Sequence, residues 1–237
     1  MRIGIPKEIK PLEGRVALVP EAAGELVRAG SEVYVQAGAG EKSGYPDSAY
    51  SAHGIQILPD AATLYGRAQL IVKVKEPIAP EYDLLRPEHV LFSYLHLAAV
   101  PELARVLQQK GLTAVAFETV EVKGRLPLLA PMSEIAGRLA VQIGAHLLHA
   151  PLGGRGILLG GLPGTEHGRV VVLGAGEAGG AAVAAAAALG AEVTVFARSR
   201  DSLVRMRQHG PNVTALHSYH SAIAAAVQQA DLLIGAV

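Results

Sequence analysis

The sequence predicts an α/β protein built from two doubly wound domains with parallel sheets, joined by a long helix. Short apolar runs rich in β-branched residues alternate with amphipathic segments twice along the chain, over residues 1–130 and again over 131–237. Glycine and proline number 27 and 14 among the 237 residues, which suits the many short turns of such a fold. Only 4% of the residues are aromatic although 50% are hydrophobic, so Ala, Val, Leu and Ile are expected to fill the cores.

The first half begins with an apolar run and alternates strand with helix from there on. Segments 20–30 and 101–111 each open with proline and close on glycine, the expected start and stop signals of a helix. No glycine-rich turn follows the first strand, so this half is expected to be doubly wound without binding a nucleotide. The predicted strands are "RIGI" (2–5), "EVYVQ" (32–36), "LIVKVK" (70–75), "VLFSY" (90–94) and "LTAVAF" (112–117).

A long helix is predicted over residues 132–149, where the composition changes. Its apolar residues Ile135, Leu139, Ile143 and Leu147 are four apart, which places them on one helical face. The second alternation then comprises a glycine-rich segment (151–164), strands at 169–174, 192–196, 212–216 and 231–237, and helices near 177–189, 201–208 and 221–229.

Composition excludes several functional classes. Lys+Arg and Asp+Glu are equal at 21 each, so no net charge draws the chain to nucleic acid or to an anionic membrane. The absence of cysteine excludes disulfides, thiolate zinc sites, iron–sulfur clusters and a cysteine nucleophile. The start lacks the apolar region of a signal peptide, and the longest weakly polar stretch, 181–191, is too short to span a bilayer. A cytoplasmic protein without nucleic-acid or membrane partners is therefore expected.

The second half carries the pattern G-x-G-x-x-G at Gly174, Gly176 and Gly179, between an apolar strand and a helix. The first glycine allows a tight turn, the second lets the backbone approach a pyrophosphate, and the third lets the helix pack close to the strand. The helix N-terminus presents unpaired N–H groups and the positive end of its dipole. The pattern predicts a Rossmann-like dinucleotide site that includes Ala175 and Ala178. The alternative is a flexible glycine-rich turn that binds no nucleotide and happens to have the same sequence pattern.

Residues 197–200, "ARSR", stand where a dinucleotide-binding fold normally keeps an acidic residue for the adenosine ribose. Ala197 removes the repulsion that a carboxylate would exert on a 2′-phosphate, and Arg198, Ser199 and Arg200 supply donors suited to one. The expected cofactor is NAD(H) or NADP(H), and these residues favour NADP(H). The alternatives are solvated surface arginines with NAD(H) bound, or a degenerate site.

Polar side chains of the first half stand at predicted strand ends, where open parallel sheets bind ligands. Lys73 and Lys75 lie two apart, so they are expected on one sheet face, with Lys75 nearer the ligand side. Arg15 follows the first strand and its planar guanidinium fits a carboxylate, while His96 follows another strand and suits proton transfer. Each alone is also compatible with a solvated charge or a structural histidine. Together they predict a site for a small substrate that carries a carboxylate.

The remaining histidines and the other common motifs give little evidence of further functional sites. His146 and His149 are three apart, as are His217 and His220, but neither pair has the accompanying carboxylates, so no metal site is expected. The sequence has no serine-nucleophile elbow and no P-loop, and too few aromatic residues for a base-stacking platform.

Several long stretches, in order over the whole chain, resemble the bacterial alanine dehydrogenases. The transhydrogenase α subunit is similar in its opening and its nucleotide turn, but "YLHLA" and "GGRGILLGG" are similar to alanine dehydrogenase. The resemblance implies reversible oxidative deamination of L-alanine to pyruvate and ammonia with a nicotinamide cofactor, in a homo-oligomer that is usually a hexamer and in some members a dimer. The matching stretches are "MRIGIPKEIKPLEGRVALVP", "IVKVKEP", "YLHLA", "PLLAPMSEIAGRLA", "GGRGILLGGLPG" and "ADLLIGAV".

The resemblance also implies roles for matching residues. Arg15 and Lys75 would hold the substrate carboxylate and carbonyl, with Lys75 also counted as catalytic, and His96 would be the acid/base. Residues 1–130 would form the N-terminal part of a substrate domain and residues 131–237 a dinucleotide-binding domain. Further cofactor contacts would be Met132, Ser133, Ser218 and Val237.

Two departures from the family's pattern leave other functions open. The family's ribose-binding aspartate matches Ala197, and a further catalytic aspartate would lie beyond Val237, so the chain is expected to be incomplete at its C-terminus. One alternative is a transhydrogenase-like subunit, or an inactive fragment, that holds the cofactor but ignores alanine. The other is a related NADP-dependent imine or amino-acid reductase.

Overall fold

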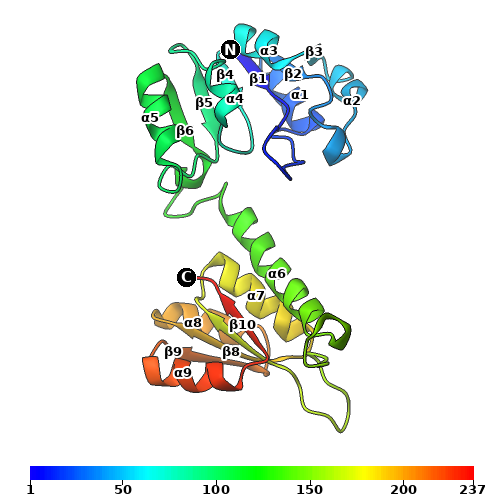
Figure 1. Cartoon of the computed structure of the whole chain (residues 1–237), viewed down its shortest axis with the longest axis vertical. Helices are drawn as coiled ribbons and strands as arrows, with labels where there is room; N and C mark the ends of the chain where they lie inside the picture. Colours follow the sequence, from blue (N-terminus) through cyan, green and yellow to red (C-terminus); the bar gives the residue numbers. More distant parts are fainter. The chain divides into compact units, whose positions relative to one another are not determined.

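The structure, a computed structural model, describes all 237 residues as two compact units, Met1–Leu126 and Pro127–Val237 (Figure 1). Every sheet strand in both units pairs in parallel with its neighbours. The predicted α/β class with parallel sheets is therefore confirmed. The division falls after Leu126 rather than after residue 130.

Unit 1, Met1–Leu126, contains a six-stranded sheet in the order β3-β2-β1-β4-β5-β6. In this doubly wound order the chain changes direction between β1 and β4, which places a ligand-binding crevice at the carboxyl ends of these strands. The five predicted strands are present, and β3 is an additional one. The elements are β1 (Arg2–Ile5), α1 (Pro20–Arg28), β2 (Glu32–Gln36), η1 (Glu41–Ser43), α2 (Asp47–Ser51), β3 (Gln56–Leu58), α3 (Ala61–Arg67), β4 (Leu70–Val72), α4 (Ala79–Tyr82), β5 (Val90–Ser93), α5 (Pro101–Lys110), β6 (Thr113–Ala116) and η2 (Phe117–Thr119).

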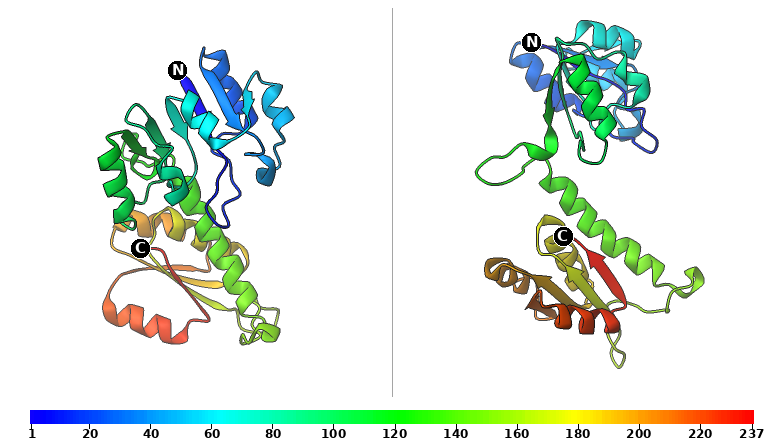
Figure 2. Two further views of the ribbon diagram at one scale, coloured as in Figure 1. Left: turned by 45° about the horizontal axis from the view of Figure 1, so that its top comes forward. Right: turned by 60° about the vertical axis from the view of Figure 1, so that its left-hand side comes forward.

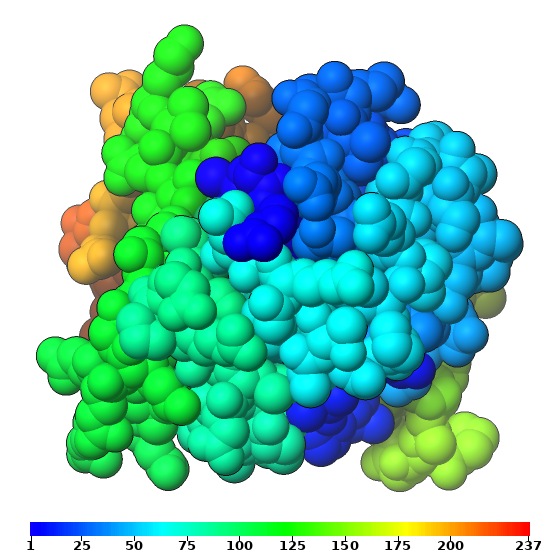
Figure 3. Space-filling view, turned by 90° about the horizontal axis from the view of Figure 1, so that it is seen from above, coloured from blue at the N-terminus to red at the C-terminus, as the bar shows by residue number.

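Two apolar cores cover the two faces of this sheet, because successive strand residues point to opposite sides. Ile3 and Ile5 of β1 pack with residues of α1 and α2, whereas Tyr34 of β2 packs with residues of α3 and α5. Figure 3 views the edge at which the strands begin, where the dark blue first residues lie against the cyan segment. There Gln69 accepts the Arg2 N–H at 3.1 Å. The opposite, carboxyl edge carries the candidate site residues described below.

Unit 2, Pro127–Val237, contains a four-stranded sheet in the order β10-β7-β8-β9 around one apolar core. This is one half of a dinucleotide-binding fold, with the glycine turn directly after the central strand β7. All predicted elements of this half are present close to their expected bounds. They are α6 (Ala130–Leu147), η3 (Ala150–Leu152), β7 (Arg169–Leu173), α7 (Glu177–Ala188), β8 (Glu192–Ala197), α8 (Arg200–Arg207), β9 (Val213–His217), α9 (His220–Gln229) and β10 (Leu232–Gly235).

The long helix α6 lies alongside α7 and β10 (Figure 2, right). Gly137 permits this approach, because a Cβ there would lie 2.0 Å from the carbonyl oxygen of Ala178. The apolar residues predicted to share one face of the helix are on the other side and are about half exposed. This α6 apolar face consists of Ile135 (49% exposed), Leu139 (45%), Ile143 (55%) and Leu147 (58%). No helix of the chain is both long enough and apolar enough to cross a membrane.

Candidate active site

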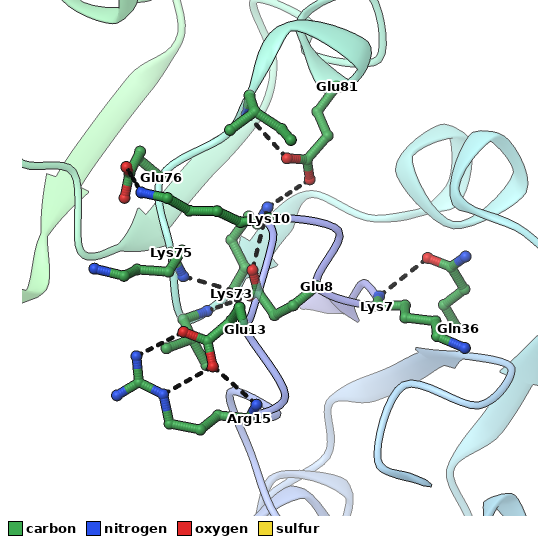
Figure 4. Close-up of polar contacts among 12 residues, drawn as sticks. Lys7, Glu8, Lys10, Glu13, Arg15, Gln36, Lys73, Lys75, Glu76 and Glu81 are labelled. Carbon is green, nitrogen blue, oxygen red and sulfur yellow. Dashed lines mark hydrogen bonds and ion pairs between the residues drawn. The ribbon is translucent and has the colours of Figure 1, made fainter. Parts of the chain in front are cut away.

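The loops after β1 and β4 meet at the carboxyl edge of the unit 1 sheet, because these two strands are neighbours. Glu8, in the loop after β1, accepts the N–H of Val74 at 2.6 Å and that of Lys75 at 3.4 Å (Figure 4). A carboxylate that accepts two backbone N–H groups ties the first loop to the end of β4. Arg15 and Lys75 are thereby carried on two loops that are joined to each other.

The two lysines after β4 have different surroundings, contrary to the expectation that both share one strand face. The strand ends at Val72, and Lys73 turns into the interior, where it is 1% exposed. Its Nζ lies 2.5 Å from Glu81 Oε1 and 3.6 Å from Glu8 Oε2, and Tyr65 donates its hydroxyl to Glu81 at 3.2 Å. Burial raises the pKa of Glu8, and the Lys73 charge opposes this. Lys73 therefore belongs to a buried ion-pair network rather than to a ligand site.

Lys75, in contrast, is half-buried, and its ammonium points away from this network, to the same side as the Arg15 guanidinium (Figure 4). Glu13 holds Arg15 by two parallel hydrogen bonds, from Nε to Oε1 at 2.9 Å and from Nη2 to Oε2 at 2.7 Å. These hydrogen bonds lower the pKa of Glu13 to about 2 against the effect of burial, and the nearby Lys75 charge acts in the same direction. Glu13 thus orients the Arg15 guanidinium and lies near the charge of Lys75.

His96 stands past the end of β5 with an unusual backbone, at a φ of +49°. Its N–H donates to Glu118 Oε1 at 2.7 Å, and its carbonyl accepts the Ala99 N–H at 2.9 Å. The imidazole is exposed, and its centroid lies 6.3 Å from that of the Tyr94 ring in an edge contact. Burial raises the pKa of Tyr94, and the Arg15 charge opposes this, so Arg15 and His96 both lie near the same Tyr94 side chain. The structure therefore brings the three predicted residues to one edge of unit 1.

Sequence reasoning missed the acidic residues that position these cations and this histidine. The alternating charges of residues 6–15 are a signal of ion pairing within that loop, which could have indicated Glu8 and Glu13. Glu118 had no such signal, because the amide that it accepts lies 22 residues away along the chain.

The glycine turn of unit 2 has the geometry that a pyrophosphate requires. Gly174 has a φ of +107°, and a Cβ there would lie 2.2 Å from the carbonyl oxygen of Ala236. A Cβ on Gly179 would lie 2.0 Å from the Gly174 carbonyl oxygen, whereas one on Gly176 would meet nothing within 4 Å. Gly176 also caps α7 without a side chain, so the first N–H groups of the helix face open space. The turn fits a dinucleotide, with room for phosphate in front of Gly176.

Other predicted cofactor residues converge on the same carboxyl edge of unit 2. Ala197 ends β8 and is paired in register with His217 of β9, and its carbonyl accepts the Ser218 N–H at 3.2 Å. Val237 follows β10 next to the turn, since a Cβ on Gly174 would come within 3.2 Å of its backbone nitrogen. Ala175 is buried and Ala178 half-buried at the start of α7.

Arg198 and Arg200 are exposed directly after β8. Ser199 between them caps α8, where its hydroxyl oxygen accepts the Ser202 N–H at 3.5 Å. That hydroxyl keeps its own hydrogen for donation. His217, which sequence reasoning considered only as a metal ligand, is exposed on the neighbouring strand end. Three basic residues, Arg198, Arg200 and His217, therefore lie exposed at the neighbouring carboxyl ends of β8 and β9.

Met132 and Ser133 are in the first turn of α6 and are half-buried. They precede Gly137 by about one helical turn, and Gly137 packs against the helix that the glycine turn begins. No cluster of three or more His, Asp or Glu side chains that could hold a metal ion occurs in the chain.

Basic and acid–base side chains at the strand ends of one unit, and a dinucleotide turn in the next, define a two-unit α/β protein of the dinucleotide-binding class. Residues 4–136 match the N-terminal domain of the alanine dehydrogenase/PNT family, and residues 140–237 match its C-terminal domain. The chain belongs to this family, which confirms the resemblance inferred from the sequence.

Relatives and solved structures agree with this assignment. The alanine dehydrogenase of Bacillus subtilis (strain 168) is 48% identical over 238 residues, which cover 100% of this chain and 63% of that protein. The alanine dehydrogenase of Mycolicibacterium smegmatis is 48% identical over 239 residues, covering 100% and 64%. A solved L-alanine dehydrogenase superposes with a TM-score of 0.93 at 48% identity, over 100% of this chain and 66% of that one. A transhydrogenase from Sinorhizobium meliloti superposes with a TM-score of 0.84 at 26% identity, over 100% and 69%. The chain thus spans somewhat less than two thirds of the alanine dehydrogenases that it matches.

Proposed function

We propose that the protein carrying this chain catalyses the reversible oxidative deamination of L-alanine to pyruvate and ammonia with a nicotinamide dinucleotide. The observation that carries the proposal is the convergence of Arg15, Lys75 and His96 at the carboxyl edge of the unit 1 sheet. Its support is the 48% identity of the whole chain to proteins named alanine dehydrogenase. These three residue types match an α-keto acid, which has a carboxylate, a carbonyl and a site of proton transfer.

The proposed roles follow from the surroundings of each side chain. Arg15, oriented by the two hydrogen bonds to Glu13, binds the substrate carboxylate through its planar guanidinium. Lys75 binds the carbonyl oxygen, where its charge stabilises negative charge that develops during reaction. His96 holds and returns the proton at that oxygen or at the imine nitrogen, because an imidazole ring can both accept and donate a proton. The bound nicotinamide dinucleotide supplies the acceptor and donor of hydride.

Unit 2 is proposed to hold that dinucleotide through backbone and a few side chains. The N–H groups after Gly176 receive the pyrophosphate, and Ser218 and Val237 border the adenosine side of the crevice. Met132 and Ser133 contact the nicotinamide. The support is the open space in front of Gly176 and the convergence of these strand ends.

Activity of the complete polypeptide that carries these 237 residues tests the proposal. Oxidation of the reduced cofactor is measured with pyruvate and ammonium, and with a panel of other α-keto acids and preformed cyclic imines. We expect pyruvate with ammonium to be the best pair, and His96→Ala to lower kcat by roughly 100-fold or more, since one acid–base group usually contributes about 100- to 10,000-fold. His149→Ala is the control, since His149 is exposed beyond the C-terminal end of α6 and has no role assigned here. Preference for a cyclic imine, or full turnover with His96→Ala, would contradict the proposal.

We further propose that the cofactor is NADP(H). Ala197 carries no charge to repel a 2′-phosphate, and Arg198, Arg200 and His217 stand around this strand end. Titration of NADH and NADPH by fluorescence should give tighter binding of NADPH, weakened at least tenfold by Arg198→Asp. Arg207→Asp makes the matched charge change at the far end of α8 and should have little effect. Tighter binding of NADH by the unaltered chain would show that the arginines are surface charges.

The second candidate function is a transhydrogenase-like subunit that holds the cofactor and ignores alanine. It is favoured by the TM-score of 0.84 to the Sinorhizobium meliloti transhydrogenase. The activity measurement separates the two, since this candidate predicts cofactor binding with no pyruvate-dependent turnover.

We also propose that the protein works in the cytoplasm as a homo-oligomer, a hexamer or a dimer, that covers the α6 apolar face. Four large apolar side chains, 45–58% exposed in one row, form the kind of surface that proteins usually bury in an interface. Ile143→Glu should shift the sedimentation of the complete polypeptide toward the monomer, while Gln142→Glu, an exposed neighbour, should not. An unchanged assembly with Ile143→Glu would contradict this interface.

A further inference from the structure

We propose that Glu118 positions His96 for proton transfer by holding its backbone, without itself touching the substrate. The inference rests on the function proposed above for His96. Glu118 lies in η2, directly after β6, and no sequence pattern or family match assigns it a role.

The contact is a clamp of one carboxylate on two consecutive amides. Glu118 Oε1 accepts the His96 N–H at 2.7 Å and the Leu95 N–H at 3.2 Å, and Oε2 accepts the same Leu95 N–H at 3.2 Å. Hydrogen bonds to an ionised acceptor are shorter and stronger than those between neutral groups. The carboxylate therefore restrains the peptide groups on both sides of the Leu95 α-carbon.

This restraint acts where the backbone is in an uncommon conformation. His96 has a φ of +49°, a region that side chains other than glycine rarely adopt because Cβ approaches the neighbouring carbonyl. Its carbonyl is also fixed, since it accepts the N–H groups of Ala99 and Val100 at 2.9 and 3.2 Å. A return to the common right-handed or extended region would turn the Cα–Cβ bond and move the imidazole from its position beside the Tyr94 ring. The left-handed residue therefore depends on its partners at both ends.

Glu118 is itself held next to paired strands and packed aromatic rings. β6 pairs with β5 in register up to Ser93 and Ala116, so η2 leaves the sheet beside the loop that contains His96. Phe117 packs edge-on against Phe92 and Tyr94, with ring centroids 4.3 and 5.1 Å apart. Only the backbone of His96 is clamped, while its imidazole is exposed. This arrangement fixes the position of the His96 α-carbon and leaves the imidazole ring available to a substrate.

Hydrogen exchange tests the clamp without requiring activity. In the chain of residues 1–237, the Leu95 and His96 amides should exchange at least tenfold faster with Glu118→Ala, and by an intermediate amount with Glu118→Gln, which keeps one oxygen acceptor. Glu121→Ala is the matched control, an exposed glutamate three positions further along. Exchange at both amides that is the same in Glu118→Ala and the unaltered chain would overturn the clamp.

A double-mutant cycle in the complete polypeptide tests the positioning role. Glu118→Ala should lower kcat for pyruvate and ammonium by roughly 10- to 100-fold, with KM for pyruvate changed by less than about twofold, since misplacement of a reacting group by about 1 Å has that effect. If Glu118 acts only through His96, the double variant with His96→Ala should be no slower than His96→Ala alone. Losses that multiply in the double variant would overturn the positioning role.

The outcomes also separate this inference from the proposed function. An unaltered protein that forms no alanine contradicts the proposed function, and with it the role given to His96. An unaltered protein that is active, with Glu118→Ala equally active, contradicts the positioning role alone. Retained activity with Glu118→Gln and loss with Glu118→Ala would support the oxygen acceptor as the essential feature.

Discussion

Replacing Gly176 by alanine should weaken dinucleotide binding while leaving unit 2 folded. The position is unusual among the three glycines of the turn, because a Cβ there meets no protein atom within 4 Å, whereas one on Gly179 would lie 2.0 Å from a carbonyl oxygen. The φ of Gly176 is −75°, which alanine adopts without strain. An added methyl group therefore costs the protein little and occupies only the space proposed for the pyrophosphate.

The expected magnitudes follow from these contacts. Alanine is a poorer helix N-cap than glycine by several tenths of a kcal/mol, and the stiffer unfolded chain returns about 0.4–1 kcal/mol. The free energy of unfolding should thus change by less than about 0.5 kcal/mol. Displacing the phosphate by the methyl group breaks at least one charge-assisted N–H···O bond, which contributes about 1.5–3 kcal/mol. The Kd should therefore rise by roughly 10- to 100-fold.

Fluorescence titration with the reduced cofactor and urea unfolding measure the two quantities on the same preparation. Gly180→Ala is the matched control, because a Cβ there meets only the flexible end of Met206 at 3.3 Å. We expect this variant to bind as the unaltered chain does. Unchanged affinity with Gly176→Ala would refute the placement of the pyrophosphate. Weakened binding together with a loss of several kcal/mol in the free energy of unfolding would refute the claim that the added methyl group occupies only the ligand's space.

Two further predictions concern the charges of unit 1. Lys73→Met leaves the buried carboxylates of Glu8 and Glu81 without their cation, so urea unfolding should show a loss of about 3–5 kcal/mol; a loss below about 1 kcal/mol would contradict the network. The pKa of Glu13 is lowered from 4.5 to about 2, so its stabilising effect is complete above pH 4.5 and disappears as the pH falls toward 2. Glu13→Gln should remove at most about 3 kcal/mol at pH 7 and flatten the acid limb of the stability profile. An acid limb identical to that of the unaltered chain would contradict this assignment.

The sequence predicted most of the fold because its signals are local. The strands of unit 2 are continuous apolar runs separated by helices of ordinary length, and each element was recognisable from its own residues. β3 (Gln56–Leu58) was missed because three residues between two short helices give no measurable periodicity. The strand predicted over 70–75 ends at Val72, although the Lys73 N–H still donates to the Phe92 carbonyl of β5 at 3.2 Å. No local pattern shows that the Lys73 side chain pairs with two buried carboxylates.

The sequence could indicate which polar residues meet at the carboxyl edge of the unit 1 sheet, but not the acidic residues that hold them in place. Arg15, Lys75 and His96 are polar residues just past apolar runs, and the order of a parallel sheet brings such positions together. Their supports depend on contacts between distant segments. Glu118 accepts an amide hydrogen 22 residues away, and Glu8 accepts one 66 residues away. These pairs could be predicted only after the order of the strands in the sheet was known.

Transfer of deuterium from the reduced cofactor to the product tests the central claim most directly. The complete polypeptide is incubated with pyruvate, ammonium and cofactor deuterated at the transferring position of the nicotinamide, and the product is examined by mass spectrometry. The account predicts L-alanine with one deuterium on its α-carbon, formed by the unaltered protein and roughly 100-fold or more slowly by His96→Ala. Absence of alanine from the unaltered protein, or alanine without deuterium, would contradict it.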